Sequence, residues 1–183
     1  MQGDPDALPD FRYHPDPVGT GSVVASAVDR ACCGQRRPFT YVGPVYAAED
    51  LDDRLCPWCI GDGRAAAMFS AEFTDGQWRA PGDVPADVAD AILHRTPGFT
   101  GWQESRWMHH RGDAAEFHGR VGAPELAAFP DALAYLRSEA AEFDWPVAQV
   151  QEYLQALSLD GQPTAYLFGC RHCKAHLAYS DFP

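Results

Sequence analysis

The spacing of apolar residues predicts a helical segment in the C-terminal half of the chain. Apolar positions recur every three or four residues in 130–143 and again in 146–157, as expected for amphipathic helices. A proline starts each stretch, where its missing backbone N–H leaves no helical hydrogen bond unmade. A shorter helix is predicted over 124–128. Earlier in the chain, residues 84–93 have one apolar face and follow Asp83, which can cap a helix.

Strands are predicted where β-branched and aromatic residues cluster between turn residues. Residues 39–46 have this composition, but a Gly-Pro pair interrupts them, so the strand must bulge or lie at a sheet edge. Residues 164–169 and 175–179 predict the two arms of a C-terminal hairpin. The stretch 98–122, which contains tryptophans, histidines and glycines, predicts short strands and turns. Together these elements predict an α+β fold.

Composition indicates a soluble protein with an acidic surface. The chain has 183 residues, of which 46% are hydrophobic, enough for one domain with a sizeable core. No stretch approaches the ~20 consecutive apolar residues that a membrane helix needs. Acidic residues outnumber Lys and Arg by 26 to 14, which gives a net charge of −12. This charge disfavours direct nucleic-acid binding and favours a basic partner, although it also serves solubility alone.

The cysteines carry the strongest chemical signal. They form three close pairs: Cys32 and Cys33, Cys56 and Cys59, and Cys170 and Cys173. Two thiolates separated by two residues can bind one tetrahedral zinc ion from a single tight turn, with Zn–S bonds of about 2.3 Å. A positively charged start followed by an apolar segment is lacking, so we expect a cytoplasmic protein with reduced cysteines.

The number of ligands leaves two metal arrangements open. One zinc ion can join both Cys-x-x-Cys turns, which brings residues 170–173 back to residues 56–59. Two zinc ions need eight ligands, so histidine must supplement the six cysteines.

In the two-ion arrangement, each Cys-x-x-Cys turn takes a partner from elsewhere in the chain. Cys32 or Cys33 adds to the first turn, and His109 or His110 adds to the second. Adjacent cysteines point in different directions, so we expect at most one of Cys32 and Cys33 to reach a given ion. Cys33, followed by Gly34, has the better turn chemistry.

The domain organisation follows from these elements. We expect a single domain over 1–183, with an extended Pro- and Gly-rich arm over 1–20. Residues 30–63 hold the first cysteine cluster. Residues 164–180 form a C-terminal zinc-knuckle hairpin, in which two strands flank a Cys-x-x-Cys turn.

Two catalytic alternatives stay open. Cys56 lies at the predicted start of a helix, so Cys56 and Cys59 can also form the dithiol of a thiol oxidoreductase. A zinc-dependent enzyme with a site near Trp102, His109 and His110 needs an open coordination position at the metal. The chain has no H-E-x-x-H motif and no Walker A loop. A non-catalytic role is therefore favoured.

Several motifs along the chain are similar to those of the CbrC family of bacterial proteins. They are residues 11–17 (FRYHPDP), 41–46 (YVGPVY), 55–63 (LCPWCIGDG), 96–98 (TPG) with 101–103 (GWQ), and 166–173 (YLFGCRHC). The resemblance extends over nearly the whole chain. It implies a cysteine-rich, zinc-binding cytoplasmic protein associated with tolerance to a nuclease-type colicin. We therefore expect a zinc-binding, non-catalytic protein that binds a basic macromolecular partner, with such a toxin as the candidate.

Overall fold

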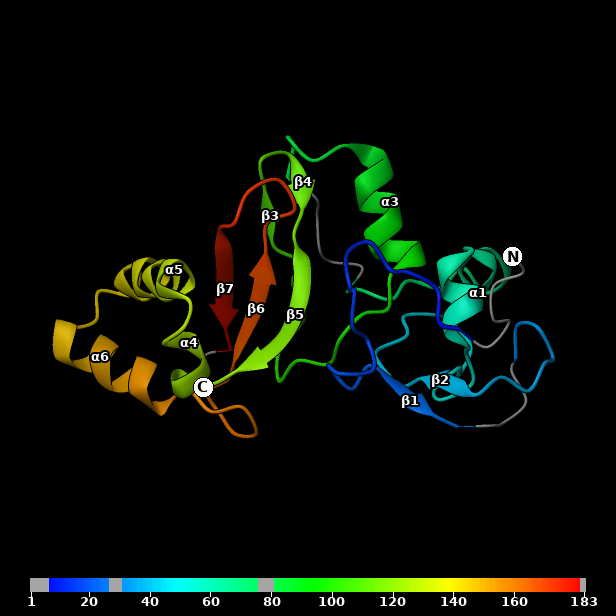
Figure 1. The fold of residues 1–183 in the computed structure, drawn as a ribbon, viewed down its shortest axis with the longest axis horizontal. Coiled ribbons are helices and arrows are strands. Elements are labelled where there is room, and N and C mark those ends of the chain that lie inside the picture. The colour runs from blue at the N-terminus through cyan, green and yellow to red at the C-terminus, as the bar shows by residue number, and fades with distance from the viewer. Residues whose placement is uncertain (1–6, 27–30, 76–80, 182–183) are drawn as a thin grey trace.

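The computed structural model describes residues 7–26, 31–75 and 81–181, and a three-stranded antiparallel sheet lies at its centre (Figure 1). Its strands, in spatial order, are β5 (Glu116–Val121), β6 (Ala165–Gly169) and β7 (His176–Ser180). β6 and β7 pair without a register shift and form a hairpin around the second Cys-x-x-Cys turn. All five residues of β6 are buried, so both faces of the sheet are covered.

A β-bulge in β5 lets this strand contribute to both faces of the sheet. The register with β6 shifts between Phe117 and Gly119, so that Phe117 pairs with Phe168 and Val121 pairs with Ala165. In a regular strand, side chains four positions apart share a face. The extra residue of the bulge changes that relationship. Phe117 therefore joins the core on one face, whereas Val121 joins the core on the other.

Three helices cover one face of the sheet (Figure 1). They are α4 (Ala123–Leu126), α5 (Pro130–Ala141) and α6 (Val147–Ala156). A proline stands at or next to the N-terminal end of each helix, as the sequence predicts. Their apolar sides enclose a helical core with the sheet, and its buried members include Leu126, Leu136, Leu154 and Leu167. The helical segment predicted for the C-terminal half is confirmed.

An aromatic core fills the opposite face, against α3 (Ala86–Arg95). Phe99 stacks on Phe117 with 3.8 Å between ring centroids, and Trp107 lies 5.7 Å from Phe99. The indole N–H of Trp107 donates to the carbonyl of Ala115 at 2.9 Å, so its one polar atom is satisfied. α3 begins two residues later than the sequence predicts, because Pro85 rather than Asp83 occupies the N-cap position.

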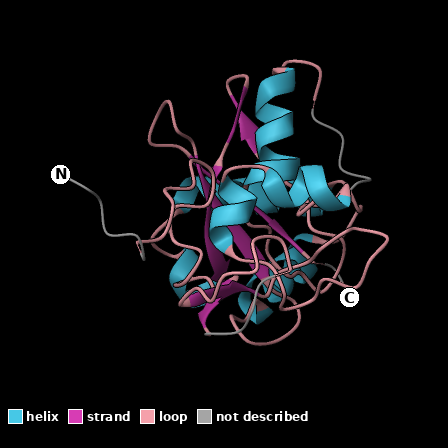
Figure 2. Cartoon of the chain, turned by 90° about the vertical axis from the view of Figure 1, so that its right-hand side faces the viewer, coloured by secondary structure: helices cyan, strands magenta, loops and turns pink. Residues whose placement is uncertain are grey.

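The N-terminal third folds around a core of its own. Its regular elements are β1 (Val23–Ala25), β2 (Phe39–Tyr41), α1 (Pro57–Gly61) and α2 (Arg64–Phe69). β2 is shorter than the strand predicted over 39–46, because it ends before the Gly-Pro pair. Gly63 has a φ of 78° and separates α1 from α2. Figure 2 views the molecule from this side and shows long loops between the short elements.

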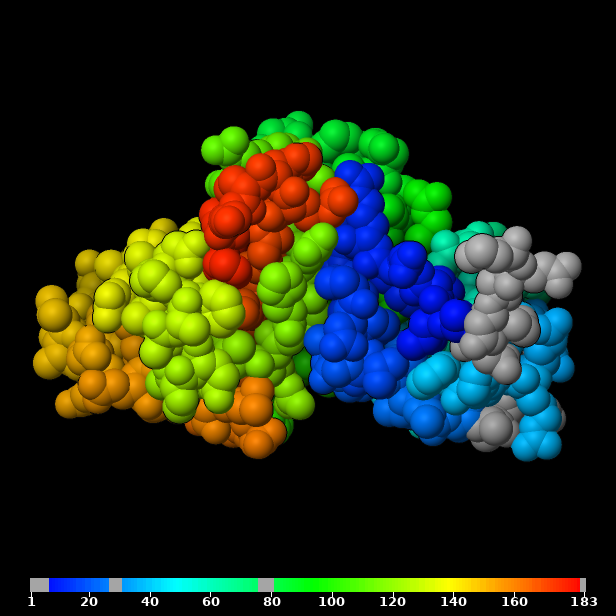
Figure 3. All heavy atoms as spheres, viewed as in Figure 1, coloured from blue at the N-terminus to red at the C-terminus, as the bar shows by residue number. Residues whose placement is uncertain are grey.

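The N-terminal segment lies across the junction between this third and the central sheet (Figure 3). Phe11 packs in the N-terminal core and Tyr13 in the aromatic core, and both side chains are buried. The backbone N–H of Phe117 donates to the carbonyl of Tyr13 at 2.8 Å, which attaches the segment to β5. Residues 1–6 of the arm predicted over 1–20 lie outside the described residues.

A tight hairpin precedes β5. β3 (His109–His110) pairs with β4 (Asp113–Ala114), and the turn residues Arg111 and Gly112 have φ values of 57° and 69°. Two consecutive residues with positive φ are typical of the type I′ turn that suits a two-residue hairpin. Short strands and turns are therefore present in the stretch 98–122, as predicted.

The described ranges contain both helices and small antiparallel sheets, which confirms the α+β class. None of the helices in these ranges is both long and apolar enough to span a membrane.

Candidate metal centres

The first thiol cluster forms where the loop 31–34 meets the start of α1. Cys56 is the N-cap of α1, so the first Cys-x-x-Cys segment makes the opening helical turn. The backbone N–H of Cys59 donates to the carbonyl of Cys56 at 3.1 Å. The sulfur atoms of these two residues are 3.3 Å apart, and the Cys33 sulfur lies 3.8 Å from that of Cys56. All three sulfur atoms lie within 4.8 Å of one another.

Cys32 lies beside the same cluster. The pKa of the Cys59 thiol is raised by its hydrogen bond with Cys56, by burial and by the neighbouring Cys32 side chain. The sequence predicts that at most one of the two adjacent cysteines reaches a given ion, because adjacent cysteines point in different directions. Only Cys33 belongs to the group of three sulfur atoms, whereas Cys32 lies in the same turn, beside Cys59.

Burial makes this cluster unsuited to free thiolates. Cys56 and Cys59 are fully buried in the N-terminal core, next to Leu55 and Ile60. Negative charges on neighbouring buried sulfur atoms repel one another, which opposes their ionisation. A bound divalent cation offsets that repulsion and lets the thiols act as thiolate ligands.

The second cluster forms at the turn of the β6–β7 hairpin. The backbone N–H of Cys170 donates to the carbonyl of Ala175 at 2.8 Å, and the N–H of His172 donates to the Cys170 sulfur at 3.3 Å. Across the turn, the Cys173 sulfur lies 3.8 Å from Nδ1 of His110, in β3. His110, Cys170 and Cys173 each offer an atom within 4.8 Å of the other two.

The distances in both clusters fit a tetrahedral zinc ion. Sulfur atoms bonded to one zinc at about 2.3 Å lie ~3.8 Å apart at tetrahedral angles. The Cys33–Cys56 sulfur pair is separated by 3.8 Å. The Cys173 sulfur and Nδ1 of His110 are also 3.8 Å apart and need to approach only slightly, because Zn–N bonds, at about 2.0–2.1 Å, are shorter than Zn–S bonds. The sulfur atoms of Cys56 and Cys59, at 3.3 Å, need to move apart only slightly. Both clusters can therefore hold a metal ion.

Comparison with known proteins assigns the chain to a family. A family model described as "Uncharacterised protein family (UPF0167)" matches residues 8–182. The chain belongs to this family. UPF0167 proteins of Mycobacterium bovis and Mycobacterium tuberculosis are each 57% identical to it over 178 residues, which are 97% of this chain and 95% of theirs. A UPF0167 protein of Pseudomonas aeruginosa is 40% identical over 171 residues, covering 92% of this chain and 94% of its own. No solved structure matches the chain.

This UPF0167 chain places its two Cys-x-x-Cys turns in separate clusters. Among the described residues, the four sulfur atoms of residues 56–59 and 170–173 do not form one group. Of the two arrangements that the sequence leaves open, the geometry matches the one with two ions. The second cluster contains His110, whereas His109 pairs with Ala114 in the hairpin and is not part of the group.

The structure does not group Trp102 with the histidines. Trp102 is half-exposed, and it lines a pocket of about 200 Å³ together with Thr20 and Arg120. His110 belongs to the second metal cluster, which is not part of this pocket. The residues proposed from sequence for a catalytic zinc site therefore lie in different surroundings.

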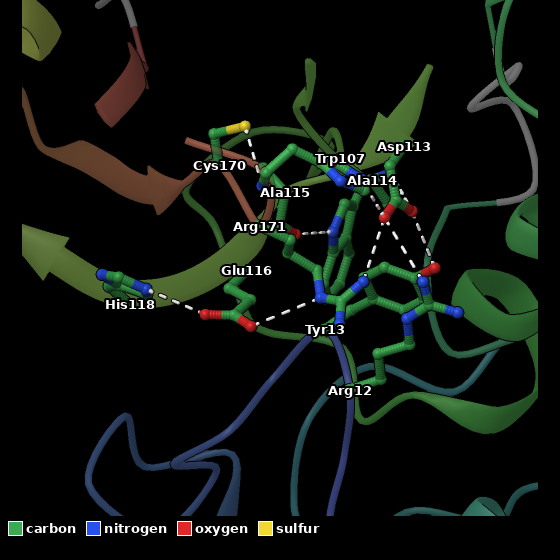
Figure 4. A network of polar contacts seen from close by, with 11 residues as sticks. Arg12, Tyr13, Trp107, Asp113, Ala114, Ala115, Glu116, His118, Cys170 and Arg171 are labelled. Carbon is green, nitrogen blue, oxygen red and sulfur yellow. Dashed lines mark hydrogen bonds and ion pairs between the residues drawn. The ribbon is translucent and has the colours of Figure 1, made fainter. Parts of the chain in front are cut away.

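Asp113 joins the two segments that carry the second cluster (Figure 4). Its side chain is buried, and Oδ2 accepts hydrogen bonds from Arg171 at 3.0 Å and His172 at 2.8 Å. Both donors lie inside the second Cys-x-x-Cys turn, whereas Asp113 follows His110 by three residues. The carboxylate thus holds the two ligand-bearing turns together without belonging to the ligand set.

The N-terminal segment reaches the same carboxylate. The Tyr13 hydroxyl donates to Oδ1 of Asp113 at 2.8 Å, and Arg12 lies 3.4 Å from Oδ2. Burial and the hydrogen bond to Asp113 raise the pKa of Tyr13 to about 12, so it remains a donor at neutral pH. Burial by itself raises the pKa of Asp113, but hydrogen bonds from Tyr13, His172 and Arg171 outweigh it and lower the pKa overall. Asp113 is therefore a charged acceptor.

Sequence reasoning missed Asp113, although it offered one signal. Asp113 follows the turn after His109 and His110, and an acidic residue next to candidate metal ligands can support them from outside the ligand set. Its donors Arg171 and His172 are far away in sequence. Only the pairing of the two hairpins brings these groups together.

Proposed function

We propose that this protein binds two zinc ions and uses them as structural cross-links rather than in catalysis. The observation that carries the proposal is the presence of two separate groups of three Cys or His ligand atoms, each group within 4.8 Å. Sulfur and imidazole donors in tetrahedral arrangement suit zinc. We place the protein in the cytoplasm, where thiols stay reduced and available to the metal.

The proposed ligands connect parts of the chain that are distant in sequence. The first set is Cys32, Cys33, Cys56 and Cys59, and the second is His110, Cys170 and Cys173. The first zinc ties the loop 31–34 to α1, and the second ties the β3–β4 hairpin to the β6–β7 hairpin. The presence of Cys32 and Cys33 beside the Cys-x-x-Cys pair supports metal binding over an oxidoreductase, which needs only one dithiol.

Zinc content tests this assignment. Protein purified without chelator should contain two zinc ions per chain, and Cys56→Ser and Cys170→Ser should each contain one. His110→Ala and His109→Ala form a matched pair, because the two histidines are adjacent and equally half-buried. We expect His110→Ala to weaken the second site and His109→Ala to retain both ions. One zinc ion per wild-type chain, or equal zinc retention in the two histidine variants, would contradict the proposal.

We further propose that the protein binds a basic macromolecular partner. The net charge of −12 supports this, because opposite charge accelerates encounter and orients the partners. The loop 49–53 concentrates part of that charge just before Cys56, and it exposes four acidic side chains: Glu49, Asp50, Asp52 and Asp53. A zinc-linked α1 would give this loop a rigid base.

The resemblance to the CbrC family extends the proposal to a specific partner. Proteins of that family are associated with tolerance to a nuclease-type colicin, and nuclease domains present cationic surfaces to nucleic acid. An acidic protein that occupies such a surface blocks access to the DNA backbone. We propose that this protein acts on a toxin nuclease domain in this way.

Binding to a purified colicin nuclease domain tests the partner. We expect measurable affinity at low salt that falls steeply as salt is added. Neutralising the acidic loop, with Glu49→Gln, Asp50→Asn, Asp52→Asn and Asp53→Asn combined, should weaken binding. A matched control removes the same charge from exposed positions around α6: Glu142→Gln, Asp144→Asn, Glu152→Gln and Asp160→Asn. Absence of binding at low salt rules out the toxin, and equal losses in the two variants rule out the loop.

A further inference from the structure

The two metal clusters differ in the group that lies next to their three ligand atoms. At the first cluster, Cys32 lies outside the group of three sulfur atoms, but its side chain interacts with Cys59, so a small movement can bring it in as a fourth thiolate. At the second, no additional Cys, His, Asp or Glu of the described residues joins His110, Cys170 and Cys173. Tetrahedral zinc takes four ligands, so the second ion has a position that these protein side chains do not fill.

Arg111 lies next to this second cluster. Its guanidinium group is within hydrogen-bonding range of the Cys173 thiol. The type I′ turn fixes this placement, because Arg111 has a φ of 57° and directly follows the ligand His110. A guanidinium group donates hydrogen bonds and accepts none, so it cannot itself be the fourth ligand.

Charge distinguishes the two clusters further. Four thiolates around a divalent ion leave an excess of negative charge, which opposes the entry of an anion. Two thiolates and a neutral imidazole leave the second zinc without net charge, and Arg111 adds a positive charge beside it. An anion with two acceptor atoms can bind the metal with one and accept hydrogen bonds from Arg111 with the other.

Access also differs. Cys56 and Cys59 are fully buried in the N-terminal core. His110 and Cys173 are both partly exposed, and the His172 side chain between the two cysteines is 48% exposed. Cys32 and Cys33 at the first cluster are partly exposed as well, and Cys170 at the second is buried. The second cluster therefore has one buried sulfur atom where the first has two, which leaves it the more accessible to an external ligand.

We propose that the metal at the second cluster keeps its fourth coordination position for an exogenous anion, and that Arg111 binds this anion. The ligand class is a small anion with two acceptor atoms, and a carboxylate is its simplest member. The inference rests on the proposed zinc sites and assigns them different roles: the first ion only cross-links the fold, and the second also binds a ligand.

Cobalt(II) substitution of the full chain tests this inference, with azide as the probe anion. The visible absorption of protein-bound cobalt reports the number and type of its ligands, and azide should change it in a saturable way. Arg111→Met should weaken azide binding about tenfold or more, because it removes a charge-assisted hydrogen bond. Arg111→Lys should retain part of the affinity. Arg137→Met, at an exposed position on α5, should behave as the wild type.

Three results distinguish a closed fourth position at the second metal from a missing metal site. A cobalt spectrum that does not respond to saturating azide, with two ions bound, overturns the open position while the zinc sites stand. Equal azide affinity in Arg111→Met and Arg137→Met overturns the role of Arg111. A wild-type chain that binds no ion at the second cluster overturns the zinc proposal itself.

Discussion

Asp113 accepts a hydrogen bond of 2.8 Å from His172, a residue that lies between the two cysteines of the second cluster. The contact links the β3–β4 hairpin to the β6–β7 turn, and each of these segments carries ligands of the same cluster. Asp113 therefore controls the relative position of His110 and the two cysteines. Arg171 contacts the same carboxylate oxygen at 3.0 Å, so the whole turn is held by one buried charge.

Asp113→Asn should loosen the second metal site without removing a ligand. The amide keeps an acceptor oxygen but loses the charge that strengthens the hydrogen bonds from Arg171 and His172. We expect zinc affinity at the second site to fall about 10- to 100-fold, as for other groups that support metal ligands. Competition with a chromophoric chelator measures this change.

The control for Asp113 is Asp90→Asn on α3. Asp90 pairs with Arg95 at 2.7 Å but is 51% exposed, so its loss should change the free energy of unfolding by less than ~1 kcal/mol and leave both zinc affinities unchanged. Equal effects of the two substitutions on the second site would contradict the positioning role of Asp113.

Cys32→Ser should weaken the first metal site selectively. Cys32 lies beside Cys59, and we expect its thiolate to complete the four ligands of that site. Loss of a ligand should cost at least as much as loss of a supporting group, on the order of 10- to 100-fold in zinc affinity. The same chelator competition measures it, and the second site serves as the internal reference. Unchanged affinity would show that the fourth ligand is another group.

Removal of zinc should destabilise the N-terminal third more than the helical core. Cys56 and Cys59 belong to the N-terminal core, whereas the helical core of α5, α6 and the sheet contains no cysteine among its described members. We expect amide hydrogen exchange to accelerate in α1 and in the loop 31–34 after treatment with a zinc chelator, while α5 stays protected. Uniform loss of protection, or none at all, would contradict this division.

His14 predicts a pH dependence that is separate from the metal sites. The ring is fully buried: its Nδ1 lies 2.6 Å from the carbonyl of Pro97, and Nε2 lies 2.6 Å from the Thr20 hydroxyl. Because the carbonyl can only accept, Nδ1 carries the proton and Nε2 accepts from Thr20. Burial lowers the pKa of His14 to about 4. The folded state therefore holds the ring neutral.

The sign of the effect follows from the two pKa values. In the unfolded chain, the histidine has a pKa of about 6.5 and becomes protonated below that pH. In the folded state, His14 stays neutral down to about pH 4, so between these values the unfolded state binds one more proton. Stability should fall with decreasing pH, by about 1 kcal/mol between pH 8 and pH 5.5 from this group alone. His14→Gln should flatten that dependence, as measured by urea unfolding at each pH. If the free energy of unfolding changes equally with pH in the wild type and in His14→Gln, a buried neutral His14 does not cause the dependence.

Local features of the sequence were sufficient to predict the helical segment. Pro130 and Pro146 stand at the starts of α5 and α6, and each helix shows its apolar spacing within its own residues. The hairpin around Cys170 and Cys173 could likewise be predicted, because its two strands are adjacent in sequence. Such elements depend on neighbours within a few positions.

The rest depends on contacts between distant residues. Either His109 or His110 could supply a metal ligand, and only the pairing register of β3 decides which one faces Cys173. The approach of Cys32 to α1 depends on a turn that the sequence does not specify. The role of Asp113 depends on contact between the β3–β4 and β6–β7 hairpins, and no periodic pattern in the sequence predicts that contact.

The order of the ligands along the chain has a consequence for biosynthesis. The first cluster is complete once Cys59 has been added, so it can capture its ion while most of the polypeptide is still being translated. The second cluster requires Cys173, which lies just before the last strand of the sheet. It can therefore form only near the end of translation. If zinc is absent during translation, the first of the two proposed sites stays empty from the time that Cys59 is added. We therefore expect the N-terminal third of the nascent chain to become sensitive to proteases before the second cluster has formed.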